Sequence, residues 1–389
     1  MTIETKAYLD YAATTPVDPR VLEAMAPYFD LLFGNPSSIH TFGQKAESAL
    51  EESRERVAKI LECSPREVIF TSCGSESDNL AIRGVALARR QRNGSNQLLT
   101  SPVEHHAVSR TVQALVDLHG FGAEYLPVDE HGIVSPADVS SRIRPETAMV
   151  SIIHANNEIG SINPIAEIGE ICQDKGIPFH TDAVQAAAHL PVAVGKLNVD
   201  LMSIGAHKFY GPKGVGALYI RQGIPILPTQ TGGGQESGLR AGTHNIPYIV
   251  GLARAFELAQ ADRDHRSQHY QTIRDSLIER VLAAIPDSRL TGHPTDRLPN
   301  HASFVFNGVD GNTLLMMLDA AGFACSSGSA CKTGDPEPSD VLLAMGLSRE
   351  WALGSLRVTL GQGTRASEVE DLLQALPALV DKCRQLAPL

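Results

Sequence analysis

Two residues with reactive side chains follow short apolar segments at a spacing typical of neighbouring β-strands. Lys208 comes just after residues 199–204, which predict a short buried strand, and the glycines around it argue against a continuing helix. Asp182 ends another predicted strand 26 positions earlier, about the length of one strand-to-strand crossover. Burial favours the neutral amine of a lysine, the form that attacks a carbonyl. We therefore expect a nucleophilic amine and a carboxylate side by side at adjacent strand ends.

This pair of groups is what pyridoxal phosphate (PLP) requires from a protein. The cofactor needs a lysine amine for its aldehyde and an acid beside its ring nitrogen, because the protonated ring draws electrons from a substrate carbanion. Each residue also has an ordinary explanation. Lys208 alone fits a surface lysine in a glycine-rich turn, and Asp182 alone fits a helix cap or a turn residue.

The sequence around both residues resembles the PLP-dependent cysteine desulfurases, which are fold type I enzymes of the aminotransferase class V family. Matching motifs follow one another along nearly the whole chain, at residues 8–16, 34–40, 72–79, 154–160, 180–185, 206–214, 240–243 and 326–331. The resemblance implies conversion of L-cysteine to L-alanine, with the sulfur left as a persulfide on Cys331 for a sulfur-acceptor protein. The pathway implied is iron–sulfur cluster assembly, or the thiolation of another cofactor or of tRNA.

A loop of small residues, 72–75, leads into a helix predicted from about Glu76 to Arg90. The free N–H groups and the positive dipole end of a helix start are a common phosphate site. Such loops are frequent, so this loop is a weak signal alone, but beside Lys208 it is a candidate site for the cofactor phosphate. The resemblance places phosphate contacts on Gly74 and Ser75.

The resemblance also assigns contacts that the residues alone do not establish. It stacks His105 on the cofactor ring, where a histidine can also exchange protons with the substrate. It places Asn157 near the ring hydroxyl and the substrate carboxylate, and it gives Gln185 and His207 contacts to the ring hydroxyl and the phosphate. Without the family context, His105 fits a capping or solvent-facing residue, and Asn157 fits a turn residue before Gly160.

Residues 231–243 form the most glycine-dense segment, and they lack the Gly-Lys-Ser/Thr ending of a nucleotide-binding P-loop. In the resembling family this segment crosses a dimer interface, and Thr243 contacts the phosphate of the cofactor in the neighbouring subunit. The resemblance therefore implies a two-fold symmetric homodimer with shared sites.

Arg357 interrupts an apolar predicted strand at 355–360. A forked guanidinium suits a substrate α-carboxylate, and an ordinary ion pair is the alternative.

Cys331 lies in a loop of small residues with Lys332 beside it, and a nearby cation favours the reactive thiolate. The resemblance makes Cys331 the sulfur acceptor, whereas Cys325, at a predicted strand end, fits a small core residue. The form of this motif and the long loop after it resemble the class that serves general iron–sulfur assembly and nitrogenase maturation.

Two features depart from the family pattern. Gly205 stands two residues before the His-Lys pair, where the family usually has a serine, so one hydroxyl to the phosphate is missing. The chain ends at Leu389, soon after the last predicted helix, whereas family members that dock a scaffold protein usually carry a longer tail. These departures leave the cofactor affinity and the identity of the acceptor protein open.

The elements that must position these residues alternate between strand and helix, which predicts an α/β fold with a mostly parallel sheet flanked by helices. The family fold implies seven strands in that sheet. We expect a large PLP-binding domain at 15–262 and a small α/β domain formed by 1–14 and 263–389, which carries the cysteine loop. Residues 245–285 read as one long helical stretch.

Composition limits the function classes. The chain has 389 residues, 43% of them hydrophobic, and a net charge of −11, which argues against nucleic acid or an anionic membrane as a surface-wide partner. No apolar run approaches a membrane span, no secretory signal precedes the fold, and six irregularly spaced cysteines suggest a cytoplasmic protein. Neither His-Glu-x-x-His nor Cys-x-x-Cys occurs, so we assign no metal site.

The rival functions share the fold. Lys208 and Asp182 would also serve a class V aminotransferase or a selenocysteine lyase. Cys331 argues against transamination, which needs no thiol, but does not exclude selenocysteine. A degenerate partner subunit is disfavoured because all three residues are present.

Overall fold

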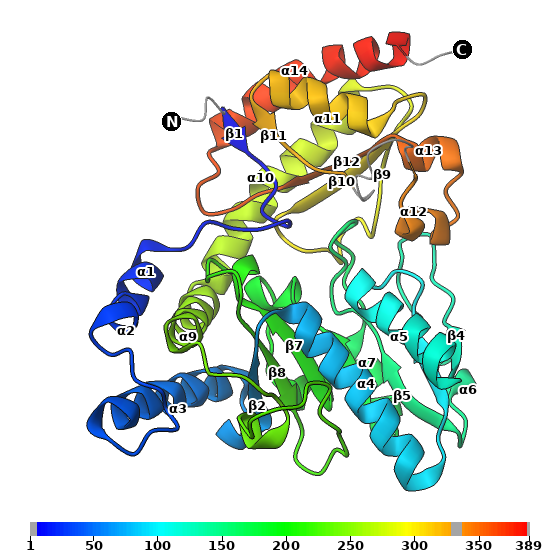
Figure 1. Cartoon of the computed structure of the whole chain (residues 1–389). Helices are drawn as coiled ribbons and strands as arrows, with labels where there is room; N and C mark the ends of the chain where they lie inside the picture. Colours follow the sequence, from blue (N-terminus) through cyan, green and yellow to red (C-terminus); the bar gives the residue numbers. More distant parts are fainter. Residues whose placement is uncertain (1–5, 328–336, 387–389) are drawn as a thin grey trace.

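The computed structural model describes residues 6–327 and 337–386. Cys331, the predicted sulfur acceptor, lies outside the described residues. Figure 1 shows two lobes: a larger one built on a broad sheet, and a smaller one that carries both chain ends. No helix in the described ranges is both long enough and apolar enough to cross a membrane.

The larger lobe contains a seven-stranded sheet in the order β2-β8-β7-β6-β5-β3-β4, which confirms the predicted α/β fold. Neighbouring strands run parallel from β7 to β4, whereas β8 is antiparallel to both β7 and β2. The strands are β2 (Val68–Thr71), β3 (Gln97–Thr100), β4 (Gly122–Tyr125), β5 (Thr147–Ser151), β6 (Phe179–Asp182), β7 (Leu201–Gly205) and β8 (Gly216–Ile220).

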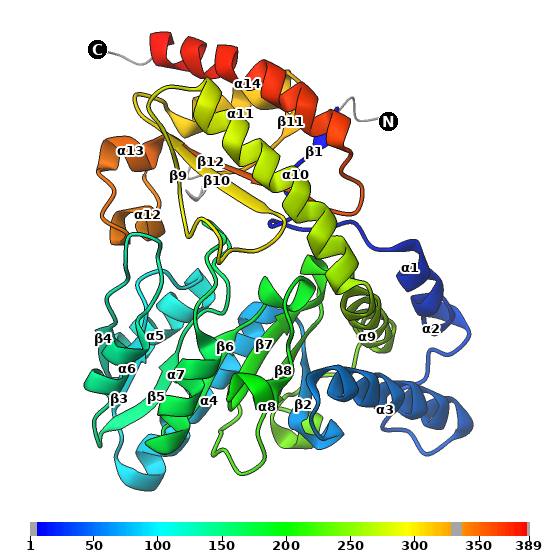
Figure 2. The same ribbon diagram turned by 180° about the vertical axis from the view of Figure 1, so that it is seen from behind.

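Helices cover both faces of this sheet, so its central strands are buried on both sides and read as apolar runs. Alternate residues of one strand point to opposite faces: Leu201 packs with α4 and α5, whereas Met202 packs with α3, α7 and α9. Figures 1 and 2 show the two faces. The helices of this lobe are α1 (Pro19–Met25), α2 (Pro27–Asp30), α3 (Thr41–Leu61), α4 (Gly74–Asn93), α5 (His106–His119), α6 (Pro136–Arg142), α7 (Ile165–Asp174), α8 (Val194–Leu197) and α9 (Ile246–Ala261).

The smaller lobe has a separate apolar core, built from helices packed on a three-stranded antiparallel sheet in the order β12-β10-β9. The N-terminal strand β1 (Ala7–Tyr8) pairs in parallel with β11 (Phe323–Ala324), the strand that precedes the cysteine loop. The remaining elements are α10 (Arg263–Ala284), β9 (Ser288–Leu290), β10 (His301–Phe306), α11 (Gly311–Ala320), α12 (Asp340–Ala344), α13 (Arg349–Leu353), β12 (Ser355–Thr359) and α14 (Ala366–Leu386).

The long helical stretch predicted for 245–285 is two helices. Helix α9 ends at Ala261 and α10 begins at Arg263, because the backbone of Asp262 leaves the helical region, with φ −108° and ψ 12°. The break lies where the chain passes from the core of the larger lobe to that of the smaller one. The division into two domains at this point stays a prediction.

Candidate active site

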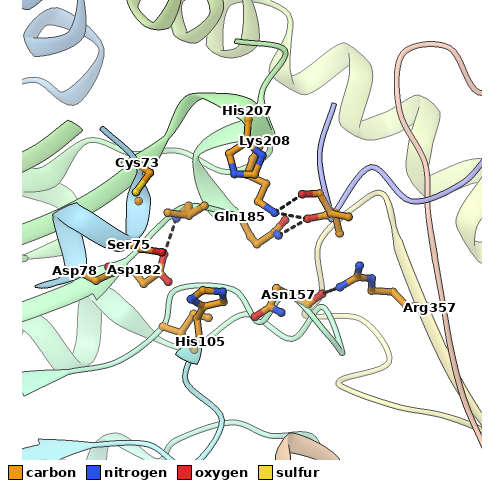
Figure 3. A pocket seen from close by; sticks show the side chains of 15 residues that line it. Cys73, Ser75, Asp78, His105, Asn157, Asp182, Gln185, His207, Lys208 and Arg357 are labelled. Atoms are coloured by element: carbon orange, nitrogen blue, oxygen red, sulfur yellow. Dashed lines mark hydrogen bonds between the residues drawn. The ribbon is translucent and has the colours of Figure 1, made fainter. Parts of the chain in front are cut away.

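Most of the predicted site residues line one cavity of about 310 Å³, which lies beyond the carboxyl ends of β6 and β7 (Figure 3). Ligand sites in α/β sheets usually lie at such strand ends. The residues that the structure brings together here are Gly74, Ser75, His105, Asn157, Asp182, Gln185, His207, Lys208 and Arg357. All except Arg357, which belongs to β12, come from the larger lobe.

Lys208 is the last residue of a single 3₁₀ turn, Ala206–Lys208, that follows β7 directly. Its Nζ donates hydrogen bonds to the carbonyl oxygens of Ala12 and Ala13, at 2.6 and 2.8 Å. Burial, followed by the charge of Arg357, lowers the pKa of Lys208 to about 8. The neutral, nucleophilic amine is therefore far more abundant near neutral pH than in an ordinary exposed lysine, although the charged form still predominates there.

Asp182 ends the neighbouring strand β6 and is 4% exposed. One carboxylate oxygen accepts from the backbone N–H of Val184 at 2.9 Å. Burial raises the pKa of Asp182, while the nearby His105 and Lys208 oppose that rise.

The ring of His105 is open to the cavity, yet desolvation lowers its pKa. Its Nδ1 also caps α5 by accepting from Ala107 N at 3.1 Å, so His105 serves as a helix cap and as a wall of the cavity.

The predicted phosphate site has the geometry of a helix start. Helix α4 begins at Gly74, two residues earlier than predicted, because the sulfur of Cys73 accepts from Glu76 N at 3.4 Å and caps it. A Cβ on Gly74 would lie 2.6 Å from Cγ2 of Val184, so no larger side chain fits beside the cavity there. His207 lies beside Lys208 in the turn after β7 and also lines the cavity, and burial lowers its pKa to about 4.

The turn after β5 is made by Asn156 rather than Asn157. The side chain of Asn156 accepts from the N–H groups of Glu158 and Ile159, at 2.8 and 3.0 Å. Asn157, which lines the cavity, is therefore free of the turn role that its position suggested. Gln185 is fixed by a 2.8 Å hydrogen bond from Nε2 to the carbonyl oxygen of Ala12.

Arg357 is buried and is held by protein groups on one side. Nη2 donates to Oδ1 of Asp10, and Nη1 donates to the carbonyl oxygen of Asn157, each at 2.8 Å. The ion pair that the sequence left open as an alternative is thus present. A guanidinium has five N–H groups, and these two hydrogen bonds use one on Nη1 and one on Nη2, so donors remain for a substrate carboxylate. Nε is buried and has no hydrogen-bond partner among the described residues.

Thr243 does not line this cavity. It is exposed, in the glycine-dense segment of the larger lobe.

Cys325 is only partly exposed. Burial, and then the charge of Asp10, raise the pKa of its thiol to about 12. A thiol with so high a pKa is almost entirely protonated at neutral pH, which suits a packing residue better than a nucleophile.

Six lining residues had no predicted site role: Ala12, Ala13, Cys73, Asp78, Ile153 and Val184. Ala12 and Ala13 act through backbone carbonyls, which leave no sequence signal. Asp78 did carry one, since it is an acid on the sheet-facing side of a helix, where apolar residues are expected.

These residues fit PLP. A glycine that tolerates no Cβ lies at a helix start suited to phosphate, a buried acid lies at the end of one strand, and a lysine of lowered pKa follows the next. Lys208 would hold the aldehyde, Asp182 the ring nitrogen, and the start of α4 the phosphate.

Comparison with known proteins agrees with this fit. Residues 7–372 match the family described as aminotransferase class-V. A cysteine desulfurase IscS of Clostridium botulinum (strain Hall) is 47% identical over 387 residues, which cover 99% of this chain and 96% of that protein. The cysteine desulfurase IscS of Methanosarcina thermophila is 48% identical over 387 residues, covering 99% and 95% of the two chains. A solved structure titled NifS-like protein has a TM-score of 0.90 and 38% identity, and the match covers 97% of this chain and 99% of that one. The chain therefore belongs to the class-V aminotransferase family of PLP-dependent enzymes.

Proposed function

We propose that this protein is a cysteine desulfurase, which converts L-cysteine to L-alanine and passes the sulfur to an acceptor protein. The observation that carries the proposal is that Lys208, Asp182 and Arg357, from the two lobes, line one cavity of a chain that is 47% identical to an IscS cysteine desulfurase. Bound PLP supplies an electron sink for the carbanion formed at the substrate Cα.

The chain's own residues bind and orient the substrate. Arg357 offers its remaining N–H groups to the substrate carboxylate, and the Asn157 side chain lies beside it. Lys208, neutral at pH values above about 8, accepts the Cα proton. Asp182 would hold the ring nitrogen of bound PLP in its protonated form, and His105 would lie over the ring, where it could exchange protons with the substrate.

Cys331 is the proposed sulfur acceptor. Its thiolate attacks the substrate sulfur, so an S–S bond forms while the C–S bond breaks. The electron pair left on the substrate carbon takes up a proton, which yields alanine and a persulfide. A second cavity of about 580 Å³ shares His105, Asn157 and Arg357 with the first, and Ser327 and Glu337 line it. The described residues on both sides of the Cys331 segment thus border the approach to the substrate.

We also propose that the active unit is a homodimer. Large apolar side chains at the start of the larger lobe are exposed, with Ile39 at 93%, and the group consists of Phe29, Leu31, Phe33, Ile39 and Phe42. A groove of about 500 Å³ connects that region to the glycine-dense segment, and it is lined by Pro36, Ser37 and Glu47 on one side and by Gln235, Ser237 and His244 on the other. A second copy of this chain would cover these side chains and would bring Thr243 to the cofactor phosphate of the neighbouring subunit.

We propose that the chain works in the cytoplasm and consists of two domains. The five cysteines in the described ranges are all free, as expected in a reducing compartment. Separate apolar cores on either side of Asp262 support domains at 15–262 and at 1–14 with 263–389. The acceptor protein belongs to iron–sulfur assembly or to another thiolation pathway.

The test is to incubate the purified protein with L-cysteine and a thiol reductant and to measure alanine and sulfide. Equal amounts of both should form with the wild-type protein, and neither should form with Lys208→Ala. Pyruvate in place of alanine would indicate β-elimination, and a keto acid formed only with an amino acceptor would indicate an aminotransferase. A far higher kcat/KM for selenocysteine would favour a selenocysteine lyase.

A further inference from the structure

A second buried acid lies behind the predicted ring-nitrogen acid. Asp78, on the first turns of α4, is 1% exposed and lines the same cavity as Asp182 (Figure 3). One ligand atom each of Asp78, Asp182 and His105 lies within 4.8 Å of the other two. Two carboxyl groups therefore share one desolvated wall of the site.

The strands behind this wall supply a chain of neutral polar groups. His180 Nδ1 is 2.8 Å from Ser151 Oγ, and His180 Nε2 is 3.0 Å from Ser203 Oγ. Ser151 is paired with His180, and Ser203 with Asp182, so these four side chains point to the face of the sheet that α4 covers. His180 Nε2 also lies 3.6 Å from Oδ1 of Asp78, an oxygen that has no hydrogen-bond partner within residues 6–327 and 337–386.

No cation among the described residues compensates Asp78. The groups that face it are Asp182 and His180 from β6, Glu104 and His105 from the segment before α5, and Cys73 from the loop before α4. Burial lowers the pKa of His180 to about 3, so that ring is neutral. Burial and then the charge of Asp182 raise the pKa of Asp78 well above its usual range, while a hydrogen bond from the Ser203 side chain opposes that rise without reversing it.

Of the two acids, Asp182 is the one whose surroundings favour the ionised form. It accepts a backbone N–H from Val184, and it faces His105 and Lys208, both of which favour its ionised form. Two carboxyl groups this close in a desolvated site do not both ionise readily. One proton is therefore retained, and it belongs on Asp78.

We propose that Asp78 is a positioning residue for Asp182: it keeps a proton near neutral pH, so that Asp182 alone carries the charge, and it releases that proton at alkaline pH to place a second negative charge near the cofactor ring nitrogen. This inference rests on the proposed role of Asp182. Its consequence is that the ring nitrogen stays protonated, and the electron sink stays effective, to a higher pH than a single acid would allow.

The first test asks where the proton is, and it does not depend on turnover. Infrared spectra of the purified full-length protein, treated with EDTA because the three groups would also fit a divalent cation, should contain bands of protonated carboxyl groups at pH 7. Asp78→Asn should remove one such band. Glu104→Gln is the matched control, because burial raises the pKa of Glu104 to about 8 and it should account for a different band. If Asp78→Asn leaves every band in place, the proposal is wrong.

Thermal unfolding provides an independent test, because the proposal predicts the direction in which the melting temperature of Asp78→Asn changes with pH relative to that of wild type. A raised folded-state pKa means that the folded protein binds the proton more tightly than the unfolded chain, so the contribution of Asp78 to stability is lost as the pH rises above about 4. The melting temperature of Asp78→Asn minus that of wild type should therefore increase from pH 5 to pH 9. A difference that is constant with pH would overturn the proposal. Asp78→Ser replaces Asp78→Asn if the latter fails to fold.

The functional test follows the ring nitrogen itself. With PLP labelled with ¹⁵N at that position, the wild-type holoenzyme should keep the protonated chemical shift to a pH about one unit higher than Asp78→Asn does. Identical titration curves would refute the role of Asp78. Failure of the proposed function looks different, because a protein that holds no PLP on Lys208 would show no bound resonance while its infrared bands still reported on Asp78.

Discussion

Arg357 Nη2 lies 2.8 Å from Oδ1 of Asp10, so the residue proposed to bind the substrate carboxylate is already paired with a protein carboxylate. The two residues are 347 positions apart, on β12 and on the segment after β1. Both side chains are largely buried, with 8% of the Arg357 side chain and 18% of the Asp10 side chain exposed. The ion pair is therefore not a surface contact, and it fixes the orientation of the guanidinium. Nε of Arg357 is buried and has no hydrogen-bond partner in the part of the chain that the structure describes.

Arg357→Lys should therefore raise KM for cysteine much more than it lowers kcat. A lysine can keep one charged contact but loses the forked geometry, at a cost of about 1.5–3 kcal/mol, or roughly tenfold or more in KM. Steady-state kinetics would measure both constants. The control is Arg365→Lys, an exposed residue paired with Glu368, which should leave both constants unchanged. An unchanged KM in Arg357→Lys would remove Arg357 from the substrate site.

Cofactor uptake should depend on the ionisation of Lys208. Because burial lowers the pKa of Lys208 to about 8, the neutral amine increases as the pH rises through that value. The rate of PLP binding to the cofactor-free protein, followed by visible absorbance, should increase as the pH rises through about 8 and should level off about one to two pH units above that value. Borohydride treatment should fix a pyridoxyl group on Lys208. A rate without pH dependence, or an adduct on Lys213, would contradict the assignment.

Gly205→Ser should tighten PLP binding. A Cβ on Gly205 would lie 3.3 Å from Cγ1 of Val184 and 3.5 Å from the backbone N of Gly74, so a serine fits with a small shift and places a hydroxyl at the predicted phosphate site. One additional hydrogen bond to a charged group, offset by this crowding, predicts a Kd lower by about three- to tenfold. Gly205→Ala is the control, with the crowding but no hydroxyl. Equal affinities for Ser and Ala would show that the hydroxyl does not reach the phosphate.

Mixed dimers should test whether the sites are shared. Lys208→Ala and Thr243→Ala subunits, unfolded and refolded together at limiting PLP, should regain roughly a quarter of wild-type activity, because half of the dimers would contain one intact site of two. Each variant refolded alone gives the baseline. No gain above that baseline, or full activity in a monomer identified by light scattering, would exclude shared sites.

Cys331→Ser should bind PLP and cysteine but lower the rate of alanine formation by roughly 100-fold or more, because only the sulfur-transfer step loses its nucleophile. Cys325→Ser should lose little activity, since burial raises the pKa of that thiol to about 12 and makes it a poor nucleophile. Mass spectrometry after one turnover should find the added sulfur on the peptide that contains Cys331. Wild-type alanine formation by Cys331→Ser would instead favour β-elimination or transamination.

Local patterns in the sequence predicted the parts of the site that sheet topology brings together. Asp182 and Lys208 each follow a buried strand, and adjacent parallel strands place such residues at one edge whatever their spacing in the chain. The start of α4 was visible because a loop of small residues precedes an amphipathic helix. Its exact first residue was not, since it depends on the unusual cap by the sulfur of Cys73.

Contacts between distant segments could not be predicted in this way. The partner of Arg357 is 347 residues away, and the groups that hold Lys208 are backbone carbonyls with no residue preference. The break at Asp262 was missed because the helical pattern continues on both sides of it. Asp78 was passed over because helix propensity describes the chain locally, whereas the role of this acid depends on the strand that lies beneath it.

The N-terminal segment links the two lobes through its backbone. Residues 7–8 pair with β11, which precedes the cysteine loop, and the carbonyl oxygens of Ala12 and Ala13 hold Lys208. A polypeptide translated from an internal start codon after Ala13 would retain Lys208, Asp182 and Cys331 and would still satisfy any search for catalytic motifs. It would nevertheless lack the only described acceptors of the lysine amine and one strand of the small lobe.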